Sequence, residues 1–341
     1  MLPHKLKECV ENLSLDLRGK TVLTEAASGH YVVTPVLAAL AGANVYAFSR
    51  TTRYGHVEEI FENTRKWMQA CGVDAHLITE ITPEIIAQAD VITNTGHLRP
   101  LTADMLQHAK DSVVIPLMYE AWEWRGADMD IEYIRRRGIK IAATNERHPD
   151  IDVFNYLGDM AMQQIFEAGT CPYRNKFVLV CNNDFGPYIA KVIARNCAGL
   201  AVIDTEENRG RYDMDNITWI GGFPDINIPE SFRNADGIIF TAYPFDQTWI
   251  GNNTPISAQK IKDQFNSPLI LRFDGHVDTA VLREKGIRYF PEHVEPGHMG
   301  VLPSAVGLDP TIRLQAGGLK VAEAMMKGDF MYKNIHVGEW M

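Results

Sequence analysis

One stretch of the chain, residues 177–204, constrains the fold more than any other. Its first apolar run ends at Val180 and gives way to a polar, turn-prone loop of residues 181–184. Gly186 then opens an amphipathic segment, and a second apolar run ends on Asp204. This order predicts a strand, a tight turn, a helix and a second strand that ends in an acid. A dinucleotide-binding unit has the same order, because a helix N-terminus faces the pyrophosphate and the acid takes a ribose hydroxyl.

The loop itself departs from the glycine-rich pattern of such units. Positions 181, 183 and 186 of the G-x-G-x-x-G spacing are Cys, Asn and Gly. Asparagine reaches the left-handed region readily, so the turn can form, but side chains stand where a pyrophosphate would meet bare backbone. Two alternatives follow: NAD binds with altered geometry, or a smaller nucleoside ligand binds instead. The predicted cofactor-binding residues are Asn182, Asn183, Asp184, Phe185, Gly186, Asp204, Thr241 and Asn145.

The charge of Asp204 selects between the two nicotinamide dinucleotides. A carboxylate at this position would repel a 2′-phosphate, so NAD is favoured over NADP. Asn145 and Glu146, by contrast, follow a predicted strand and lead toward a helix. They either touch the nicotinamide amide or the substrate, or they belong to the cap of that helix.

The first half of the chain repeats the pattern of the second. An apolar run at residues 21–24 is followed by Gly29, which precedes Gly42 by 13 residues. Gly186 precedes Gly199 by the same 13 residues, and later strands and helices correspond in the same order. Alternating strands and helices are typical of parallel sheets. The sequence therefore predicts an α/β fold with two doubly wound, Rossmann-like domains of similar topology and a cleft between them.

These patterns divide the chain into two predicted domains. Residues 1–150 together with a C-terminal segment, 311–341, form a substrate or catalytic domain, and residues 151–310 form a dinucleotide-binding-type domain. Residues 151–168 have helical spacing and are predicted to cross from one domain to the other. A last helix is predicted at 311–327 with no strand after it. This helix either returns to the first domain or caps the second.

Composition excludes several classes of function. The formal net charge of −10 argues against a nucleic-acid surface, which needs a basic stripe. The chain has no uninterrupted apolar run of about 18 residues and no signal-peptide pattern at its start, so no membrane segment is predicted. Five cysteines without a C-x-x-C pair indicate free thiols, and His293 and His298 lack the helical spacing of a metal site. We expect a cytoplasmic enzyme without a metal.

Three short motifs resemble one superfamily. Residues 184–186 (DFG) are similar to the end of the G-x-G-D-V-G loop of S-adenosylhomocysteine hydrolases, and Asp204 lies where the ribose-binding acid of that family falls. Residues 275–278 (GHVD) resemble its G-H-F-D segment, and residues 30–45 resemble its H-M-T…L-x-x-L-G-A-x-V stretch. The chain thus resembles the superfamily of these hydrolases and the D-isomer-specific 2-hydroxyacid dehydrogenases. The resemblance implies NAD, an active site in the interdomain cleft and a homodimer.

His276 is the first catalytic candidate. It follows a predicted strand in a glycine-containing loop at the carboxyl edge of a sheet, where open α/β folds bind ligands. An imidazole titrates near neutrality and can pass the proton that accompanies hydride transfer. Alternatively, His276 only orders the loop around Asp274 and Asp278.

The corresponding segment of the first half, residues 119–125 (YEAWEWR), is the second candidate. Glu120 beside tryptophan would have a raised pKa and act as an acid or base, and Arg125 would clamp a substrate carboxylate. Alternatively, the segment is an aromatic plug at a domain interface with salt-bridged acids.

The first-half counterpart of the dinucleotide loop is predicted to bind the substrate. Ser28, Gly29 and His30 precede a helix whose N-terminus suits an anionic or polar group. Arg50 and Arg53 follow the next strand, and they either close on the substrate or are simply solvated.

Together these patterns predict an NAD-dependent oxidoreductase acting on a small polar substrate, with His276 as acid/base and Glu120 or Arg125 in support. Three alternatives remain open: a hydrolase or lyase with tightly bound NAD, a transferase that uses S-adenosylmethionine, and a non-catalytic nucleotide-binding protein. The lost glycines favour the last alternative, whereas the dense polar groups after both sets of strands favour an enzyme.

Overall fold

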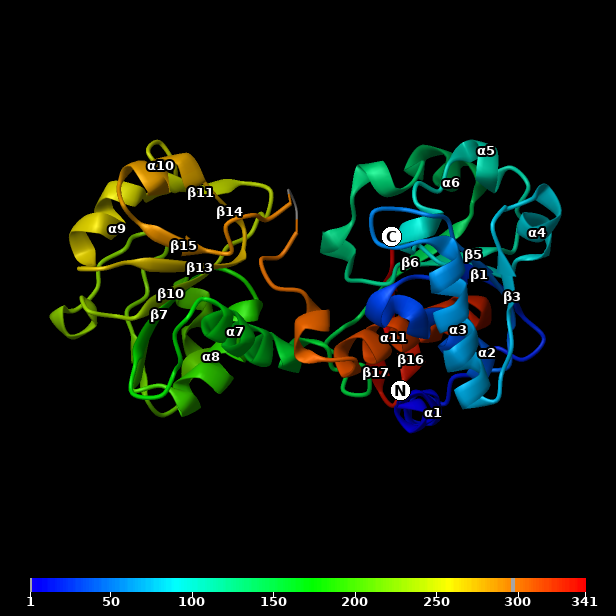
Figure 1. Cartoon of the computed structure of the whole chain (residues 1–341), viewed down its shortest axis with the longest axis horizontal. Coiled ribbons are helices and arrows are strands. Elements are labelled where there is room, and N and C mark those ends of the chain that lie inside the picture. The colour runs from blue at the N-terminus through cyan, green and yellow to red at the C-terminus, as the bar shows by residue number, and fades with distance from the viewer. Residues whose placement is uncertain (1, 296–297) are drawn as a thin grey trace. The chain divides into compact units, whose positions relative to one another are not determined.

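The computed structural model describes residues 2–295 and 298–341, and the chain divides into two compact units (Figure 1). Unit 1 comprises Met1–Val153 and Gly307–Met341, and unit 2 comprises Phe154–Val306. Each unit is built on a parallel sheet covered by helices, as the alternation of strands and helices predicts. The predicted fold class, two doubly wound α/β domains of similar topology, is confirmed.

The main sheet of unit 1 has the strand order β18-β6-β5-β4-β1-β2-β3. Strand β18 runs antiparallel to β6, and the other neighbours pair in parallel. The strands are β1 (Thr21–Glu25), β2 (Asn44–Phe48), β3 (His76–Ile78), β4 (Val91–Ile92), β5 (Val114–Pro116), β6 (Lys140–Thr144) and β18 (Gly338–Trp340).

Successive residues of these strands enter different cores, which shows that helices cover both faces. Val22 and Val114 belong to one apolar cluster, while their neighbours Leu23 and Ile115 belong to another. The first cluster includes residues of α1 (Pro3–Asn12), α2 (Val33–Leu40), α3 (Val57–Cys71) and α11 (Asp309–Lys327), which pack together (Figure 1). The second includes residues of α4 (Pro83–Gln88), α5 (Ala103–Leu106) and α6 (Ile131–Arg137).

The predicted C-terminal helix exists, but the prediction that no strand follows it is wrong. After α11 the chain forms a hairpin of β16 (Met331–Tyr332) and β17 (Ile335–His336), and then β18. In β18, Gly338 pairs with Thr144 and Trp340 with Ala142 of β6. A strand this short has no hydrophobic periodicity to read, so only the neighbouring sheet edge identifies it.

The main sheet of unit 2 has the strand order β15-β13-β10-β7-β8-β9, and its strands pair in parallel. These strands are β7 (Lys176–Cys181), β8 (Gly199–Ile203), β9 (Ile217–Trp219), β10 (Gly237–Thr241), β13 (Leu269–Asp274) and β15 (Arg288–Phe290). A small parallel sheet contains β11 (Thr248–Gly251), β12 (Ile256–Ser257) and β14 (His276–Val277). The helices are α7 (Leu157–Glu167), α8 (Phe185–Asn196), α9 (Ala258–Gln264) and α10 (Thr279–Glu284).

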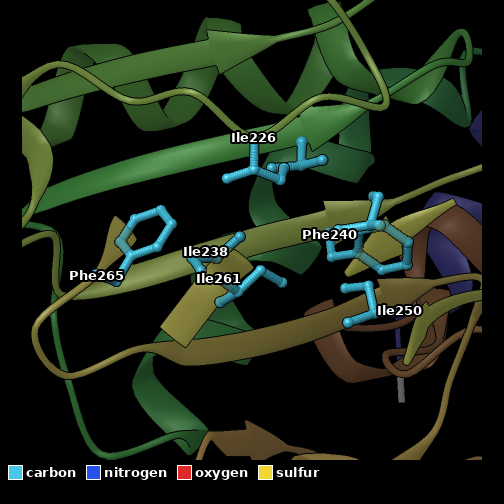
Figure 2. A pocket seen from close by; sticks show the side chains of 8 residues that line it. Ile226, Ile238, Phe240, Ile250, Ile261 and Phe265 are labelled. Atoms are coloured by element: carbon cyan, nitrogen blue, oxygen red, sulfur yellow. The ribbon is translucent and has the colours of Figure 1, made fainter. Parts of the chain in front are cut away.

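An apolar space inside unit 2 belongs to its core. The side chains around it are aliphatic or aromatic, and the gap among them admits no water molecule (Figure 2). Without a polar group to orient a ligand, this space serves packing. Its lining residues are Val180, Ile226, Ile238, Phe240, Ile250, Ile256, Ile261 and Phe265.

In both main sheets the order in which strands are added reverses beside the first strand of the unit. In unit 1, β1 lies between β2 and β4, and in unit 2, β7 lies between β8 and β10. The loops that leave the carboxyl ends of such a strand pair diverge, and open α/β folds bind ligands in the crevice between them. We call these two places the switch points. Among the described residues no helix is long and apolar enough to cross a membrane.

Candidate functional site

At the switch point of unit 2, several predicted cofactor-binding residues meet, but they bond to the chain itself. The Asn182 side chain donates to the carbonyl oxygen of Tyr243 and accepts from its backbone N–H, both at 2.8 Å. The Asn183 side chain donates to Thr241 Oγ1 at 3.1 Å and accepts from the Phe185 N–H at 3.0 Å. These bonds tie the loop after β7 to the end of β10 across the switch point.

The N-terminus of α8 offers a weaker anion site than the helix order suggests. The Phe185 N–H is already bonded to Asn183, and Pro187 has no N–H to donate. The carboxylate of Asp184 accepts from Arg211 at 2.5 Å and adds a negative charge at this helix end. A pyrophosphate here would face an aspartate as well as the positive end of the helix dipole.

The acid predicted to bind ribose, Asp204, is fully buried and fully bonded. Its Oδ1 accepts from the Thr205 N–H at 2.6 Å and from Asn208 at 3.1 Å. Its Oδ2 accepts from the Tyr212 hydroxyl at 2.5 Å and from the Cys181 thiol at 3.1 Å. We call Cys181, Asp204, Asn208 and Tyr212 the Asp204 cluster. Burial is the main reason that the pKa values of Cys181 and Tyr212 are raised, so both remain protonated donors.

Gly186 lets α8 approach this cluster. A Cβ atom at Gly186 would lie 2.2 Å from the Tyr212 hydroxyl and 2.5 Å from the Cys181 sulfur. The retained glycine of the loop therefore packs against a tyrosine and a cysteine. The carboxylate of Asp204 is an acceptor that suits a ribose hydroxyl, because it already accepts a hydrogen bond from one hydroxyl group. That hydroxyl belongs to Tyr212.

His276 lies at the carboxyl end of β13, as its sequence position predicts. It opens the short strand β14, its side chain is half-buried, and its backbone N–H donates to Gln247 at 3.2 Å. The neighbouring Asp278 caps α10 by accepting from the Val281 N–H at 3.1 Å. The segment is well placed on the sheet edge, and its catalytic role stays a prediction.

In unit 1, three glutamates follow the ends of β5 and β6. Glu120 is buried, and its two oxygens accept from the Glu146 N–H at 2.9 Å and from Arg147 at 3.0 Å. Its own N–H donates to Glu123 at 3.1 Å. Burial raises the pKa of Glu120, while Arg147 counteracts this shift. With both oxygens engaged, Glu120 holds the two loops together.

Glu123 and Glu146 form the more reactive arrangement. Their side chains hydrogen-bond to each other. Burial raises the pKa of Glu123 to about 7, and burial together with the Glu123 charge raises the pKa of Glu146 well above its ordinary value. Two carboxyl groups can share a hydrogen bond only when one of them is protonated. Glu123 and Glu146, the acidic pair, therefore hold a proton near neutral pH.

A fourth acid lies at the switch point itself. Glu25 ends β1, is 4% exposed and accepts from the His97 N–H at 2.7 Å. Burial raises its pKa as well. Burial, followed by the charges of Glu25, Glu123 and Glu146, raises the pKa of Tyr31, so these acids surround one phenol. The ends of β1, β5 and β6 thus contribute to one polar region.

Beside this region, a hydrogen-bonded network fixes the loop after β4. Arg99 donates to the carbonyl and side-chain oxygens of Asn94 at 2.9–3.1 Å and lies 3.4 Å from Asp128. Asn94 donates to the Tyr119 hydroxyl at 2.9 Å, and this hydroxyl lies 3.3 Å from Asp128. Burial raises the pKa of Tyr119 to about 12, so its hydroxyl stays a donor. This network sets the walls of the polar region.

Four buried polar atoms in loops that follow strands of unit 1 have no hydrogen-bond partner among the described residues. They are His30 Nδ1, Ser49 Oγ, His97 Nδ1 and Trp124 Nε1. They follow β1, β2, β4 and β5, which are neighbours in the sheet. Buried polar atoms in folded proteins are nearly always bonded. Donors and acceptors left open at one sheet edge are therefore suited to bind a polar ligand.

The other predicted residues of unit 1 lie around this edge with different roles. Gly29 has a φ of 63°, which a glycine adopts without strain, and Ser28 beside it is half-buried. Arg50 is exposed, and the exposed Arg53 donates to the Tyr54 hydroxyl at 2.7 Å.

Arg125 and Asn145 differ in how closely they approach the acidic pair. Arg125 is exposed, and its charge lowers the pKa of Glu123 against the larger effect of burial. The Asn145 side chain donates to the carbonyl oxygen of His336 at 2.8 Å. Asn145 thus anchors the segment that leads into β18.

The sequence favours Glu120 over Glu123 as the acid, offers Glu146 only as a contact for the nicotinamide or the substrate, and does not single out Glu25 or Tyr212. Glu25 directly follows the first apolar run, so the rule that ligands bind at the carboxyl ends of strands identifies it. The acidic pair has a similar signal, since both members lie shortly after predicted strands. Tyr212 has none in the sequence. In residues 2–295 and 298–341, no group of three or more His, Cys, Asp or Glu residues is arranged to hold a metal ion.

Comparison with known proteins identifies the fold. No protein family and no curated protein matches the sequence. Solved structures do match it. The A chain of dipicolinate synthase from Bacillus subtilis has a TM-score of 0.57 at 14% identity, covering 92% of this chain and 99% of that one. A D-lactate dehydrogenase with NAD+ from Lactobacillus jensenii has a TM-score of 0.51 at 12% identity, covering 93% and 99%. A transhydrogenase from Sinorhizobium meliloti has the same TM-score at 13% identity, covering 93% and 99%.

The chain has the fold of these proteins. The predicted resemblance to the 2-hydroxyacid dehydrogenase superfamily is thus confirmed at the level of the fold. At 12–14% identity, the likeness shows the fold alone. The resemblance to S-adenosylhomocysteine hydrolases stays a prediction.

Proposed function

We propose that this chain is an NAD-dependent oxidoreductase that acts on a small polar substrate, with the acidic pair of unit 1 exchanging the proton. The observation that carries this proposal is the hydrogen bond between Glu123 and Glu146 at the carboxyl edge of a doubly wound sheet. A group that titrates near pH 7 is the most effective acid or base at that pH. Glu123 meets this condition because burial raises its pKa to about 7.

The acidic pair can work in both directions of a redox reaction. With its shared proton it protonates the oxygen or nitrogen that forms when a carbonyl or imine is reduced. After losing this proton, it takes one from the hydroxyl or amine that is oxidised. Glu120 is a positioning residue in this scheme, since its carboxylate binds the Glu146 N–H and Arg147. The prediction that Glu120 itself transfers the proton is replaced by this proposal.

The unpaired polar atoms supply contacts for the substrate. His30 Nδ1, His97 Nδ1 and Ser49 Oγ can bind hydroxyl, amino or carboxylate groups, and Trp124 Nε1 can donate to an oxygen. Arg125 stands close enough to Glu123 to influence its charge, so a substrate carboxylate bound by Arg125 would lie near the acidic pair. A compact, polar substrate uses these groups best.

NAD is proposed as the cofactor because the fold is that of a D-lactate dehydrogenase with NAD+. When bound, NAD accepts or returns the hydride. In this chain Asp204 would hold a ribose hydroxyl, and the remaining N–H groups at the start of α8 would face the phosphates. Tyr212 must leave Asp204 first. The proposals of a site between the two domains, of a homodimer and of a role for His276 rest on the resemblance alone.

A second candidate function is a hydrolase or lyase whose chemistry is proton transfer at the same acidic pair. It is favoured by the hydrogen bonds of unit 2, because Asp204 and the Phe185 N–H already have partners within the chain. The transferase alternative, with S-adenosylmethionine, has no further support from the site.

The test is a redox assay of the purified protein against small hydroxy acids, amino acids and their oxo counterparts. We expect one substrate class to change the absorbance of NADH in either direction. The Glu123→Gln variant should lose this activity, whereas Glu132→Gln, an exposed glutamate of α6 in the same unit, should keep it. Unchanged NADH with every class, or full activity in Glu123→Gln, would contradict the proposal. Substrate consumption without a change in NADH would favour the hydrolase or lyase.

A further inference from the structure

The carboxylate of Asp204 is closed to solvent and to ligands by a residue that follows it by eight positions. Its side chain is 0% exposed, and the short hydrogen bond from the Tyr212 hydroxyl covers Oδ2. A ribose held by this acid needs the position that the phenol occupies, since both groups present a hydroxyl donor to the same oxygen. Cofactor and tyrosine therefore exclude each other at Asp204.

Tyr212 is attached in a way that allows this exchange. It is the buried end of a 3-10 segment, Glu206–Tyr212, whose other residues are exposed or half-buried. Gly210 within the segment has open space around it. Removal of Tyr212 from the cluster breaks its hydrogen bonds with Asp204 and, at 3.2 Å, with the Cys181 sulfur. It also ends the contact with the Trp219 ring, 5.5 Å away, and leaves the strands of the sheet paired.

The remaining members of the cluster stay in place when Tyr212 is absent. Asn208 and the Thr205 N–H hold Oδ1, and the Cys181 thiol still donates to Oδ2. Asp204 would then keep its orientation and gain one free acceptor position. The vacated space lies against Gly186 at the start of α8, where a Cβ atom would touch the phenol oxygen. A ribose in that space would be close to the helix end that faces a phosphate.

We infer that Tyr212 is an internal competitor for the ribose-binding acid, so that its hydroxyl must be displaced from Asp204 before a dinucleotide binds. This inference rests on the proposed use of NAD. The competition lowers the affinity for NAD, because only the fraction of molecules in which the phenol is displaced can bind. Without the Tyr212 side chain, the same residues would bind NAD more tightly. A ligand without a hydroxyl donor cannot replace the hydrogen bond that Tyr212 makes with Asp204.

The experiment compares NAD binding by isothermal titration in the full chain and its variants. Tyr212→Ala should bind NAD about ten-fold more tightly or better, as expected when a competing bond to a charged group is removed. Asp204→Asn added to Tyr212→Ala should abolish the gain. Tyr173→Ala, which removes an exposed tyrosine of the same unit, should bind like the unmodified chain. Tyr212→Phe keeps the ring and should shift affinity in the same direction, which preserves the test if the alanine variant misfolds.

Unchanged or weaker NAD binding in both Tyr212 variants would overturn the inference. The proposed function has a separate readout, the turnover of NADH. Tight binding by Tyr212→Ala without any NADH turnover would support the competitor and contradict the oxidoreductase. NADH turnover by the unmodified chain, together with no gain in Tyr212→Ala, would support the oxidoreductase and overturn the competitor.

Discussion

The switch points of the two units have the same strand order and opposite hydrogen-bonding states. In unit 2, Asn182 bonds to Tyr243 across the crevice, and Tyr212 bonds to Asp204. In unit 1, buried polar atoms lack partners among the described residues, and Glu123 and Glu146 share a proton. Both arrangements belong to doubly wound sheets whose switch points lie beside β1 and β7.

This difference shows that the sheet fixes where the loops meet and that the side chains fix whether a ligand can bind there. The sheet brings loops together at the same place in both units, but their side chains decide whether that place is available. A unit whose polar groups are mutually satisfied gains stability and gives up affinity, whereas unsatisfied buried groups cost stability and are retained at functional sites. This contrast between the two switch points agrees with the proposal that the proton transfer belongs to unit 1 and the cofactor to unit 2.

The largest expected effect comes from comparing an acid of each unit. Glu146→Gln removes the shared proton of the acidic pair and should lower kcat by about 10²–10⁴-fold, the usual contribution of acid–base catalysis. Asp204→Asn should weaken NAD binding and leave kcat at saturating NAD nearly unchanged. Steady-state kinetics of both variants checks this. Equal losses of kcat would remove the distinction between the two units.

The hydrogen bond from Tyr212 to Asp204 should also contribute to the free energy of unfolding of unit 2. Tyr212→Phe leaves the buried Asp204 with one donor fewer, and a hydrogen bond to a charged group contributes about 1.5–3 kcal/mol. We expect urea unfolding of unit 2 to shift to lower denaturant by this free energy. Tyr173→Phe, at an exposed tyrosine of the same unit, is the control. A stability equal to that of the control would mean that the Tyr212 hydroxyl is not bonded to Asp204 in solution.

The pH dependence of turnover should report the acidic pair of unit 1. Burial raises the pKa of Glu123 to about 7, so its carboxyl group is neutral below this pH and charged above it. Substrate reduction needs the acid, and its rate should fall by about ten-fold per pH unit above this value. Oxidation needs the base, and its rate should rise through the same pH. Both limbs should disappear in Glu123→Gln, and a limb that persists there would assign the titration to another group.

The smallest effect is expected from Glu25 at the unit 1 switch point. Burial raises its pKa, so the folded state binds a proton more tightly than the unfolded chain does. Its contribution to stability is complete below the ordinary pKa and is lost as the pH rises through the raised value. Glu25→Gln should therefore flatten the decline of stability in this range, where one group changes it by at most about 1.4 kcal/mol per pH unit. Urea unfolding across pH, with Glu132→Gln as control, measures the slope. Parallel curves would show that Glu25 stays charged.

The sequence was sufficient for the framework of unit 2 because apolar runs and turns are local signals. The run that ends at Val180 is β7, and Asp204 directly follows β8. The hydrogen bonding of Asp204 was not predictable, because it depends on how the segment after β8 folds back and places Tyr212 beside it. An acid after a strand has the same appearance in a sequence whether it is free or already bonded.

The acidic pair illustrates the same limit in unit 1. Glu123 and Glu146 are 23 positions apart, and only the pairing of β5 with β6 brings their loops together. Glu120 was preferred because it is nearer to its strand, and this nearness is what engages both its oxygens in holding the loop after β6. Distance from a strand end thus separates structural from reactive acids less well than hydrogen bonding does.

The pairing of β18 with β6 also affects how this protein should be handled in the laboratory. The chain segment before β18 accepts hydrogen bonds from Asn145, through the carbonyl oxygens of His336 and Val337. Asn145 is the immediate neighbour of Glu146, so the tail and the acidic pair share one stretch of backbone. A truncation of the chain before Ile335 would remove both acceptors of Asn145 and would therefore disturb the backbone that positions Glu146.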